Sequence, residues 1–338
     1  MVKAILRGRL ALGDKGAEFE RLLAQKIGIQ HAWLVNSGSS ANLIAINSLR
    51  SAELKDERGY LKVGDGIIST ALNFPTTINP IIQSGLKPIL VDSELGSYTI
   101  NLEQMKEMIE NEENNVKAIM IPHLFGSVNN MDEIMRIAKE HALYVIEDCC
   151  DALGPTWMNK IAGSFGDLST FSFYPAHHIT IGEGGAVGIN NPHFYKIVRS
   201  LREWGRACWC GQNAGPNGAC GKRFGWQLGK LPFGYDHKFT YTNIGFNLKP
   251  TEICAAMGIP QLEKLDFILK RREENFNKLY ATFSDYKDYF ILPKSLNGAN
   301  NKGWFFFPIT VRQEAGFKAD DIIKFLDVEK NIETRRLF

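Results

Sequence analysis

Two adjacent histidines, His177 and His178, lie in the stretch DLSTFSFYPAHHITIGEGGAV. Imidazole titrates near neutral pH, so such a side chain can take up or release a proton during catalysis. Residues 169–173 alternate polar and aromatic side chains, which predicts a strand with one buried face, and a glycine-rich turn leads to a second apolar run at 186–189. A strand followed by a polar turn can hold a reactive side chain at a sheet edge. An ordinary hairpin with surface histidines fits the same residues.

Cysteines form a second set of reactive groups. Three of the six lie within a 13-residue polar loop, and Cys150 lies 58 positions before the first of them. The three are Cys208, Cys210 and Cys220. If the loop meets Cys150, four thiolates would suit either zinc or an iron–sulfur cluster. The spacing differs from that of common zinc sites, so the residues alone leave the metal open. Cys149 competes with Cys150 as a ligand, and Cys254 is expected to be a core thiol.

The elements that would position these groups follow an alternating pattern. Apolar runs predict strands, and amphipathic stretches predict helices. The expected strands are 31–35, 67–70, 88–92, 116–121, 143–146, 169–173, 186–189 and 304–310, and the expected helices include 18–30, 41–50, 252–283 and 320–326. This alternation favours an α/β fold with a mostly parallel sheet sandwiched by helices. Ligands of such sheets bind at the carboxyl ends of the strands.

Two segments at predicted strand ends could bind a ligand. The turn NSGSS at 36–40 leads into a helix, and its backbone N–H groups would face a phosphate at the positive end of the helix dipole. A plain N-cap explains the same residues. Glu147 and Asp148 follow the strand 143–146 and either face solvent or pair with a cofactor.

These motifs resemble the DegT/DnrJ/EryC1/StrS family of sugar aminotransferases, which are fold type I enzymes that use pyridoxal phosphate. FSFYPAHHITIGEGGAV is similar to the segment that carries the cofactor-binding lysine in that family, and the lysine position falls on His177. A histidine cannot form the covalent imine that a lysine amine forms with the cofactor. The resemblance therefore implies the Lys-to-His branch, the sugar 3-dehydrases. Those enzymes hold pyridoxamine phosphate without a covalent bond. In this chain the resemblance implies that His177 is the base.

The resemblance also assigns residues around the cofactor. Gly38, Ser39 and Ser172 match phosphate contacts, and Phe74 matches the aromatic that stacks on the pyridine ring. Asp148 matches the carboxylate that pairs with the protonated ring nitrogen and keeps the ring an electron sink.

Two further residues have expected roles at this site. Asn247 resembles an asparagine that reaches the cofactor phosphate of the neighbouring subunit, which implies a homodimer. Tyr174, three residues before His177, is expected to steady a radical or assist proton transfer.

The four cysteines resemble those of the iron–sulfur CDP-6-deoxy-4-hexulose 3-dehydrases, in which they hold a 2Fe–2S cluster. The gap between Cys210 and Cys220 is longer than in that pattern. The implied reaction is C3 dehydration of a CDP-sugar in 3,6-dideoxysugar biosynthesis, typically for a surface polysaccharide. Its electrons would come from an NADH-dependent iron–sulfur flavin reductase. A cluster-free 3-dehydrase or aminotransferase-like enzyme, and an inactive metal-stabilised scaffold, are the alternatives.

Composition narrows the class of protein. The 338 residues are 44% hydrophobic and 22% charged, which is typical of a globular protein. A net charge of +2 without a long basic run argues against a nucleic-acid partner, and no apolar run is long enough to span a membrane. Without a signal peptide the expected location is the cytoplasm, where thiols stay reduced.

The resemblance covers nearly the whole chain and implies two domains. We expect a large cofactor-binding domain over residues 1–250 and a smaller C-terminal α/β domain over residues 251–338. Family members continue beyond Phe338, so the chain is expected to be a fragment.

Overall fold

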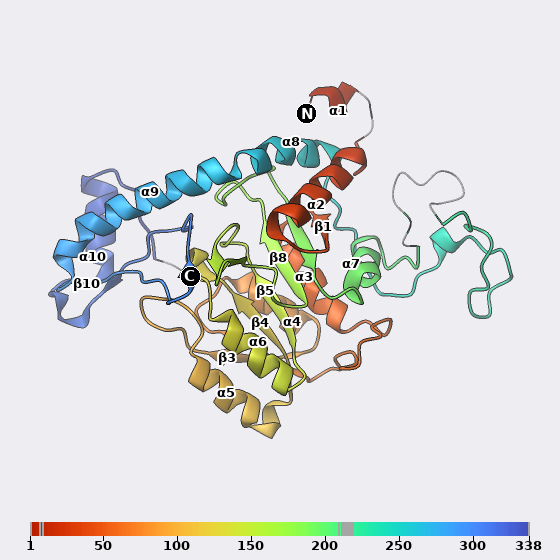
Figure 1. Ribbon diagram of the computed structural model, residues 1–338, viewed down its shortest axis with the longest axis horizontal. Coiled ribbons are helices and arrows are strands. Elements are labelled where there is room, and N and C mark those ends of the chain that lie inside the picture. Colours follow the sequence, from red (N-terminus) through yellow and green to blue (C-terminus); the bar gives the residue numbers. More distant parts are fainter. Residues whose placement is uncertain (1, 7, 9, 209, 211–219, 337–338) are drawn as a thin grey trace.

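The computed structural model describes residues 2–6, 8, 10–208, 210 and 220–336 (Figure 1). Its centre is a seven-stranded sheet in the order β1-β9-β8-β5-β4-β2-β3. The strands are β1 (His31–Val35), β2 (Gly66–Thr70), β3 (Lys87–Val91), β4 (Val116–Pro122), β5 (Tyr144–Asp148), β8 (Leu168–Ser172) and β9 (Gly185–Ile189). Within this sheet β9 runs antiparallel to its neighbours β1 and β8, whereas β3, β2, β4, β5 and β8 pair in parallel. The predicted mostly parallel sheet is confirmed.

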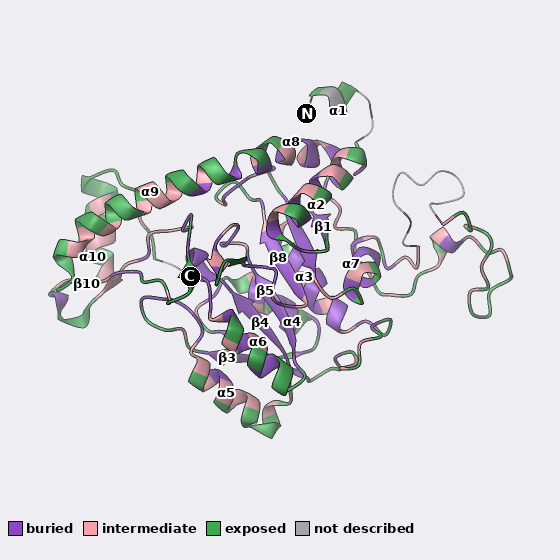
Figure 2. Cartoon of the chain, in the orientation of Figure 1, coloured by how far each residue is buried: buried purple, intermediate pink, exposed green. Residues whose placement is uncertain are grey.

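Helices cover both faces of the sheet, and the buried residues concentrate in its strands (Figures 1 and 2). The helices are α1 (Val2–Leu6), α2 (Asp14–Ile27), α3 (Gly38–Leu49), α4 (Pro75–Gln83), α5 (Leu102–Glu110), α6 (Met131–Glu140), α7 (Phe194–Arg202), α8 (Glu252–Glu263), α9 (Leu265–Phe283) and α10 (Ala319–Lys324). Side chains alternate along β4, because successive strand residues point to opposite faces. Ile119 and Ile121 pack in the core that includes α2, α6 and α8, whereas Met120 packs in the core that includes α3 and α7. No helix in the described part of the chain combines the length and apolarity that a membrane span requires.

The region after α7 differs from the sequence-based expectation in two ways. The helix expected over 252–283 is interrupted at Lys264, which caps both α8 and α9. The strand expected over 304–310 is wrong, because only Thr310 belongs to a strand, β12 (Thr310–Val311). Trp304 instead stacks on Phe276 of α9, with ring centroids 4.8 Å apart, so packing of the aromatic side chains overrides their strand propensity.

Short strands complete the fold. A three-stranded sheet has the order β11-β6-β7, and β10 pairs with β12. Their bounds are β6 (Thr156–Trp157), β7 (Lys160–Ile161), β10 (Phe290–Ile291) and β11 (Ala299–Asn300). The division into domains over 1–250 and 251–338 stays a prediction.

Candidate active site

A cavity of about 480 Å³ opens at the carboxyl ends of β4, β5 and β8 and at the N-termini of α3 and α4. Asp148 is the last residue of β5 and Ser172 the last residue of β8, and both line the cavity. The parallel arrangement brings these strand ends to one edge of the sheet, where ligands of α/β folds bind.

The phosphate cradle predicted at residues 36–40 lies in this cavity. Ser37 caps α3 by accepting a hydrogen bond from the Ser40 N–H, and Ser37, Gly38 and Ser39 line the cavity. A Cβ at Gly38 would lie 2.6 Å from the Ser172 Cβ and 3.0 Å from the Cys150 Sγ, so only glycine permits this close approach. The tertiary structure therefore brings the three predicted phosphate residues together beside the positive end of α3.

Asp148 is a buried carboxylate held in a fixed orientation. Its Oδ2 accepts hydrogen bonds from Asn42 Nδ2 at 2.9 Å and from Thr77 Oγ1 at 2.7 Å, and its Oδ1 accepts one from the Cys150 N–H at 3.1 Å. The side chain faces the cavity and is about 6% exposed. A carboxylate on the cavity floor, with a phosphate cradle close by, fits the ring nitrogen and the phosphate of a pyridoxamine cofactor.

His177 lines the same cavity. Its Nδ1 is buried without a hydrogen-bond partner among the described residues and lies 3.7 Å from the Asp151 Oδ1. Phe305 stacks on its ring at 4.9 Å, and Arg272 donates hydrogen bonds to the carbonyl oxygens of Ala176 and His177. Burial lowers the pKa of His177 to about 4. The imidazole is therefore neutral at pH 7 and can accept a proton.

The neighbouring histidine has a different place. His178 is buried, and its Nε2 lies 2.6 Å from the carbonyl oxygen of Gly303. Burial lowers the pKa of His178 to about 3, so it stays neutral. Thus His177 faces the cavity, whereas His178 connects the turn after β8 to the C-terminal segment that contains Gly303.

Two predicted aromatic residues lie on the cavity wall. Phe74 and Tyr174 both line the cavity and are about half exposed. Asn247 is exposed and does not line the cavity of its own chain. Its Oδ1 accepts a hydrogen bond from Lys249 Nζ at 3.1 Å.

Of the four predicted cysteine ligands, one lies among the described residues that line the cavity. Cys150 lines the cavity, whereas the three loop cysteines do not. Among the described residues no three of these thiols come within 4.8 Å of one another. Residues 209 and 211–219 of the loop lie outside the described residues, and the described residues 220–240 that follow them extend away from the sheet on the side opposite α10 (Figure 1). A cluster held by Cys150, Cys208, Cys210 and Cys220 therefore stays a prediction.

Cys149 and Cys150 occupy different environments. Cys149 is fully buried, and its Sγ lies beside Gly163, whereas Cys150 reaches the cavity. Burial raises the pKa of both thiols. Its access to the cavity favours Cys150 over Cys149 as a ligand.

Several site residues carried no recognisable signal in the sequence. They are Asn42, Thr77, His123, Asp151, Arg272 and Phe305. For Asp151 the one available indication was its position, three residues beyond Asp148 in the same strand-end segment. Burial and the nearby Asp148 raise the pKa of Asp151 to about 7.

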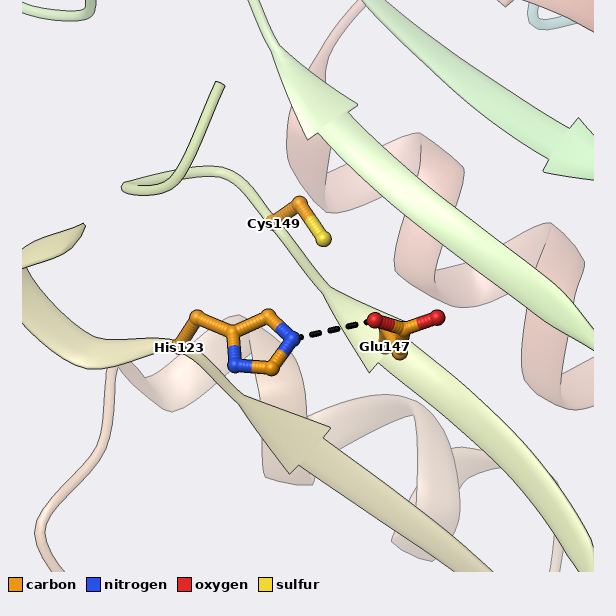
Figure 3. Close-up of side chains that lie close together, drawn as sticks. All are labelled: His123, Glu147 and Cys149. Atoms are coloured by element: carbon orange, nitrogen blue, oxygen red, sulfur yellow. Dashed lines mark hydrogen bonds and ion pairs between the residues drawn. The ribbon is translucent and has the colours of Figure 1, made fainter. Parts of the chain in front are cut away.

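A buried cluster of His123, Glu147 and Cys149 lies next to the cavity (Figure 3). The Asn129 N–H donates to His123 Nδ1 at 3.3 Å, so the proton is on Nε2, which donates to Glu147 Oε2 at 3.1 Å. Glu147 also accepts three backbone N–H groups at 2.7 Å, from Gly163, Phe165 and Gly166. Because the imidazole lone pair and both carboxylate oxygens are already in use, this cluster is a hydrogen-bond network and not a metal site.

We expect Glu147→Gln to lower the free energy of unfolding by about 1–3 kcal/mol, because an amide nitrogen cannot accept the N–H bonds that a carboxylate oxygen accepts. Urea denaturation measures this loss. The exposed Glu140→Gln on α6 is the matched control and is expected to change stability by less than about 0.5 kcal/mol. Equal effects of the two substitutions would contradict a supporting role for the network.

Comparisons with known proteins agree with this geometry. The model of the DegT/DnrJ/EryC1/StrS aminotransferase family matches residues 1–338. The chain is 44% identical over 338 residues to the lipopolysaccharide biosynthesis protein RfbH of Salmonella typhimurium, covering 100% of this chain and 75% of that protein. It is also 44% identical to the dTDP-4-dehydro-2,6-dideoxy-D-glucose 3-dehydratase of Saccharopolyspora spinosa, covering 100% of this chain and 71% of that protein.

A solved structure gives the same result. The E. coli GDP-4-keto-6-deoxy-D-mannose-3-dehydratase with bound hydrated PLP superposes with a TM-score of 0.85 at 29% identity, covering 99% of this chain and 80% of that chain. The fold is thus that of PLP-dependent aminotransferases and dehydratases, and the chain is similar to enzymes that act on nucleotide sugars. This chain belongs to the DegT/DnrJ/EryC1/StrS aminotransferase family.

Proposed function

We propose that this chain removes the C3 hydroxyl group of a nucleotide-linked 4-keto-6-deoxyhexose, with pyridoxamine phosphate as cofactor and His177 as the base. The observation that carries the proposal is the neutral imidazole of His177 in the cavity that also contains Asp148 and the phosphate cradle. An imidazole at the lysine position favours proton transfer over covalent attachment of the cofactor.

Each side chain around the cofactor would have a different role in this reaction. When bound, pyridoxamine phosphate supplies an amine for the 4-keto group and a carbon acid at C4′. Asp148 would pair with the ring nitrogen, Gly38, Ser39 and Ser172 would bind the phosphate, and Phe74 would stack on the ring. His177 would take the C4′ proton and return a proton to the departing C3 hydroxyl, which leaves as water.

Tyr174 and Asn247 have roles at the edge of this site in the proposal. Tyr174 lies on the cavity wall, where its phenol can assist proton transfer. Asn247 is exposed and outside its own cavity, which supports a homodimer in which Asn247 of the partner subunit reaches the cofactor phosphate.

We further propose that Cys150, Cys208, Cys210 and Cys220 hold a 2Fe–2S cluster. The position of Cys150 on the cavity wall supports this, because a cluster there would lie close to the substrate. Reduction of the dehydrated sugar requires two electrons, which an NADH-dependent iron–sulfur flavin reductase would supply. We propose a CDP-sugar as substrate and a 3,6-dideoxysugar as product, formed in the cytoplasm.

The test is anaerobic purification followed by iron and zinc analysis and a turnover assay. We expect about two irons per chain. With pyridoxamine phosphate and the reductase present, we also expect mass spectrometry to show that the CDP-4-keto-6-deoxyhexose loses one oxygen atom, because the loss of one water is followed by the gain of two hydrogens. Cys208→Ser should lose the iron, and Cys254→Ser, which changes a thiol outside the predicted ligand set, should keep it.

Each contradictory outcome has a different meaning. Zinc without iron would contradict the redox step and leave a cluster-free dehydratase. No water loss in the presence of pyridoxamine phosphate and a reductase would contradict the dehydration itself.

A further inference from the structure

The fixed charges of the cavity wall are unevenly distributed. Asp148, Asp151 and Glu183 contribute carboxyl groups, and Arg335 is the one arginine or lysine among the described residues that line the cavity. The substrate of the proposed function carries a diphosphate in addition to the cofactor phosphate at α3. A second anion therefore needs a cation on this wall, because carboxylates repel it.

Arg335 lies on the wall that also carries His177. Its guanidinium carbon lies 5.5 Å from the ring centroid of Phe306, and Phe306 lies 4.3 Å from Phe305, which stacks on His177 at 4.9 Å. Consecutive ring contacts thus link the exposed Arg335 to the proposed base. A ligand held by Arg335 would place its attached sugar toward His177.

The adjacent Arg336 provides a contrast. Arg336 makes an ion pair with Asp320 at 2.6 Å on the exposed surface. Arg335 has no carboxylate within ion-pair distance in the described part of the chain, although it lines a cavity that carboxyl groups also line. A planar guanidinium without a carboxylate partner can bind phosphate oxygens through two parallel hydrogen bonds.

We propose that Arg335 binds the diphosphate of the nucleotide-sugar substrate and sets the depth at which the sugar meets His177. The inference rests on the proposed function for the identity of the ligand. Arg335 would contact the phosphates and not the nucleobase. Its contribution to binding would therefore be the same for cytidine, thymidine and guanosine nucleotides.

Calorimetric titration of the pyridoxamine phosphate-loaded chain with CDP, dTDP and GDP tests this, because it requires no turnover. Arg335→Ala should weaken the binding of each nucleotide that the unsubstituted chain binds, by about tenfold or more and by the same factor. Arg335→Lys should give an intermediate affinity, because lysine keeps the charge but not the planar fork. Arg336→Ala is the matched control and should bind with unchanged affinity.

The experiment separates this inference from the proposed function. If the chain binds CDP through Arg335 but fails to dehydrate the sugar, the subsite stands and the proposed reaction falls. The inference is overturned if the unsubstituted chain binds none of the three nucleotides, or if Arg335→Ala binds them as tightly as the unsubstituted chain. It is also overturned if Arg336→Ala loses as much affinity as Arg335→Ala. An equal loss of affinity for cytidine, which has no phosphate, would also overturn it.

Discussion

Replacing His177 with asparagine is expected to lower the dehydration rate by about 10²–10⁴-fold, the usual contribution of a positioned general base. Asparagine is of similar size and can remain beside Phe305, so the cavity should keep its shape. Turnover of the 4-keto sugar and the affinity for pyridoxamine phosphate are the two measurements. We expect the rate to fall and the affinity to stay within about threefold, because the phosphate and ring contacts come from other residues.

The neighbouring His178 sharpens this test. His178→Asn removes the contact with the Gly303 carbonyl and should lower stability more than it lowers the rate at a temperature where the protein is folded. His141→Asn, at an exposed position after α6, should change neither. Retained turnover in His177→Asn would refute the assignment of the base.

The pH profile adds a second check on the same residue. Because burial lowers the pKa of His177 to about 4, the imidazole is neutral and competent as a base above that pH. The part of the rate that depends on this base should therefore be lost as the pH falls through about 4, and not near the ordinary histidine pKa of 6.5.

Replacing Asp148 with asparagine is expected to have the second large effect, a loss of about 10²–10³-fold in turnover. The substitution removes the negative charge that would pair with the protonated ring nitrogen, and truncating one partner of a buried charge pair costs about 2–5 kcal/mol. The amide also places an N–H₂ group where Asp148 now accepts from Asn42 and Thr77. Steady-state turnover and the affinity for pyridoxamine phosphate measure the effect, and both should fall.

A surface carboxylate serves as the control for this prediction. Asp132→Asn changes an exposed residue in the first turn of α6 and should leave turnover and cofactor affinity unchanged. If Asp148→Asn binds the cofactor and turns over like the unsubstituted chain, Asp148 does not contact the ring nitrogen. Circular dichroism of both variants distinguishes this result from a loss of fold.

Local sequence patterns were sufficient to predict the helices and strands whose side chains pack on regular faces. The apolar runs at β4 and β5 and the turn before α3 were predicted within a few residues. These elements depend on the periodicity of hydrophobic residues and on helix capping, and both are determined by residues close together in the sequence. The strand expected over 304–310 failed because Trp304 and Phe305 pack against α9 and His177, contacts that strand propensity does not encode.

The sequence by itself therefore determined the α/β sheet and the turn before α3 that we predict to hold a phosphate, and the resemblance to a known family singled out His177 as the predicted base. Only the tertiary structure showed that Asn42 and Thr77 orient Asp148, that Phe305 covers His177, and that Arg335 lies on the same wall. These contacts join residues far apart in the chain, and the packing of whole strands and helices decides which of them meet.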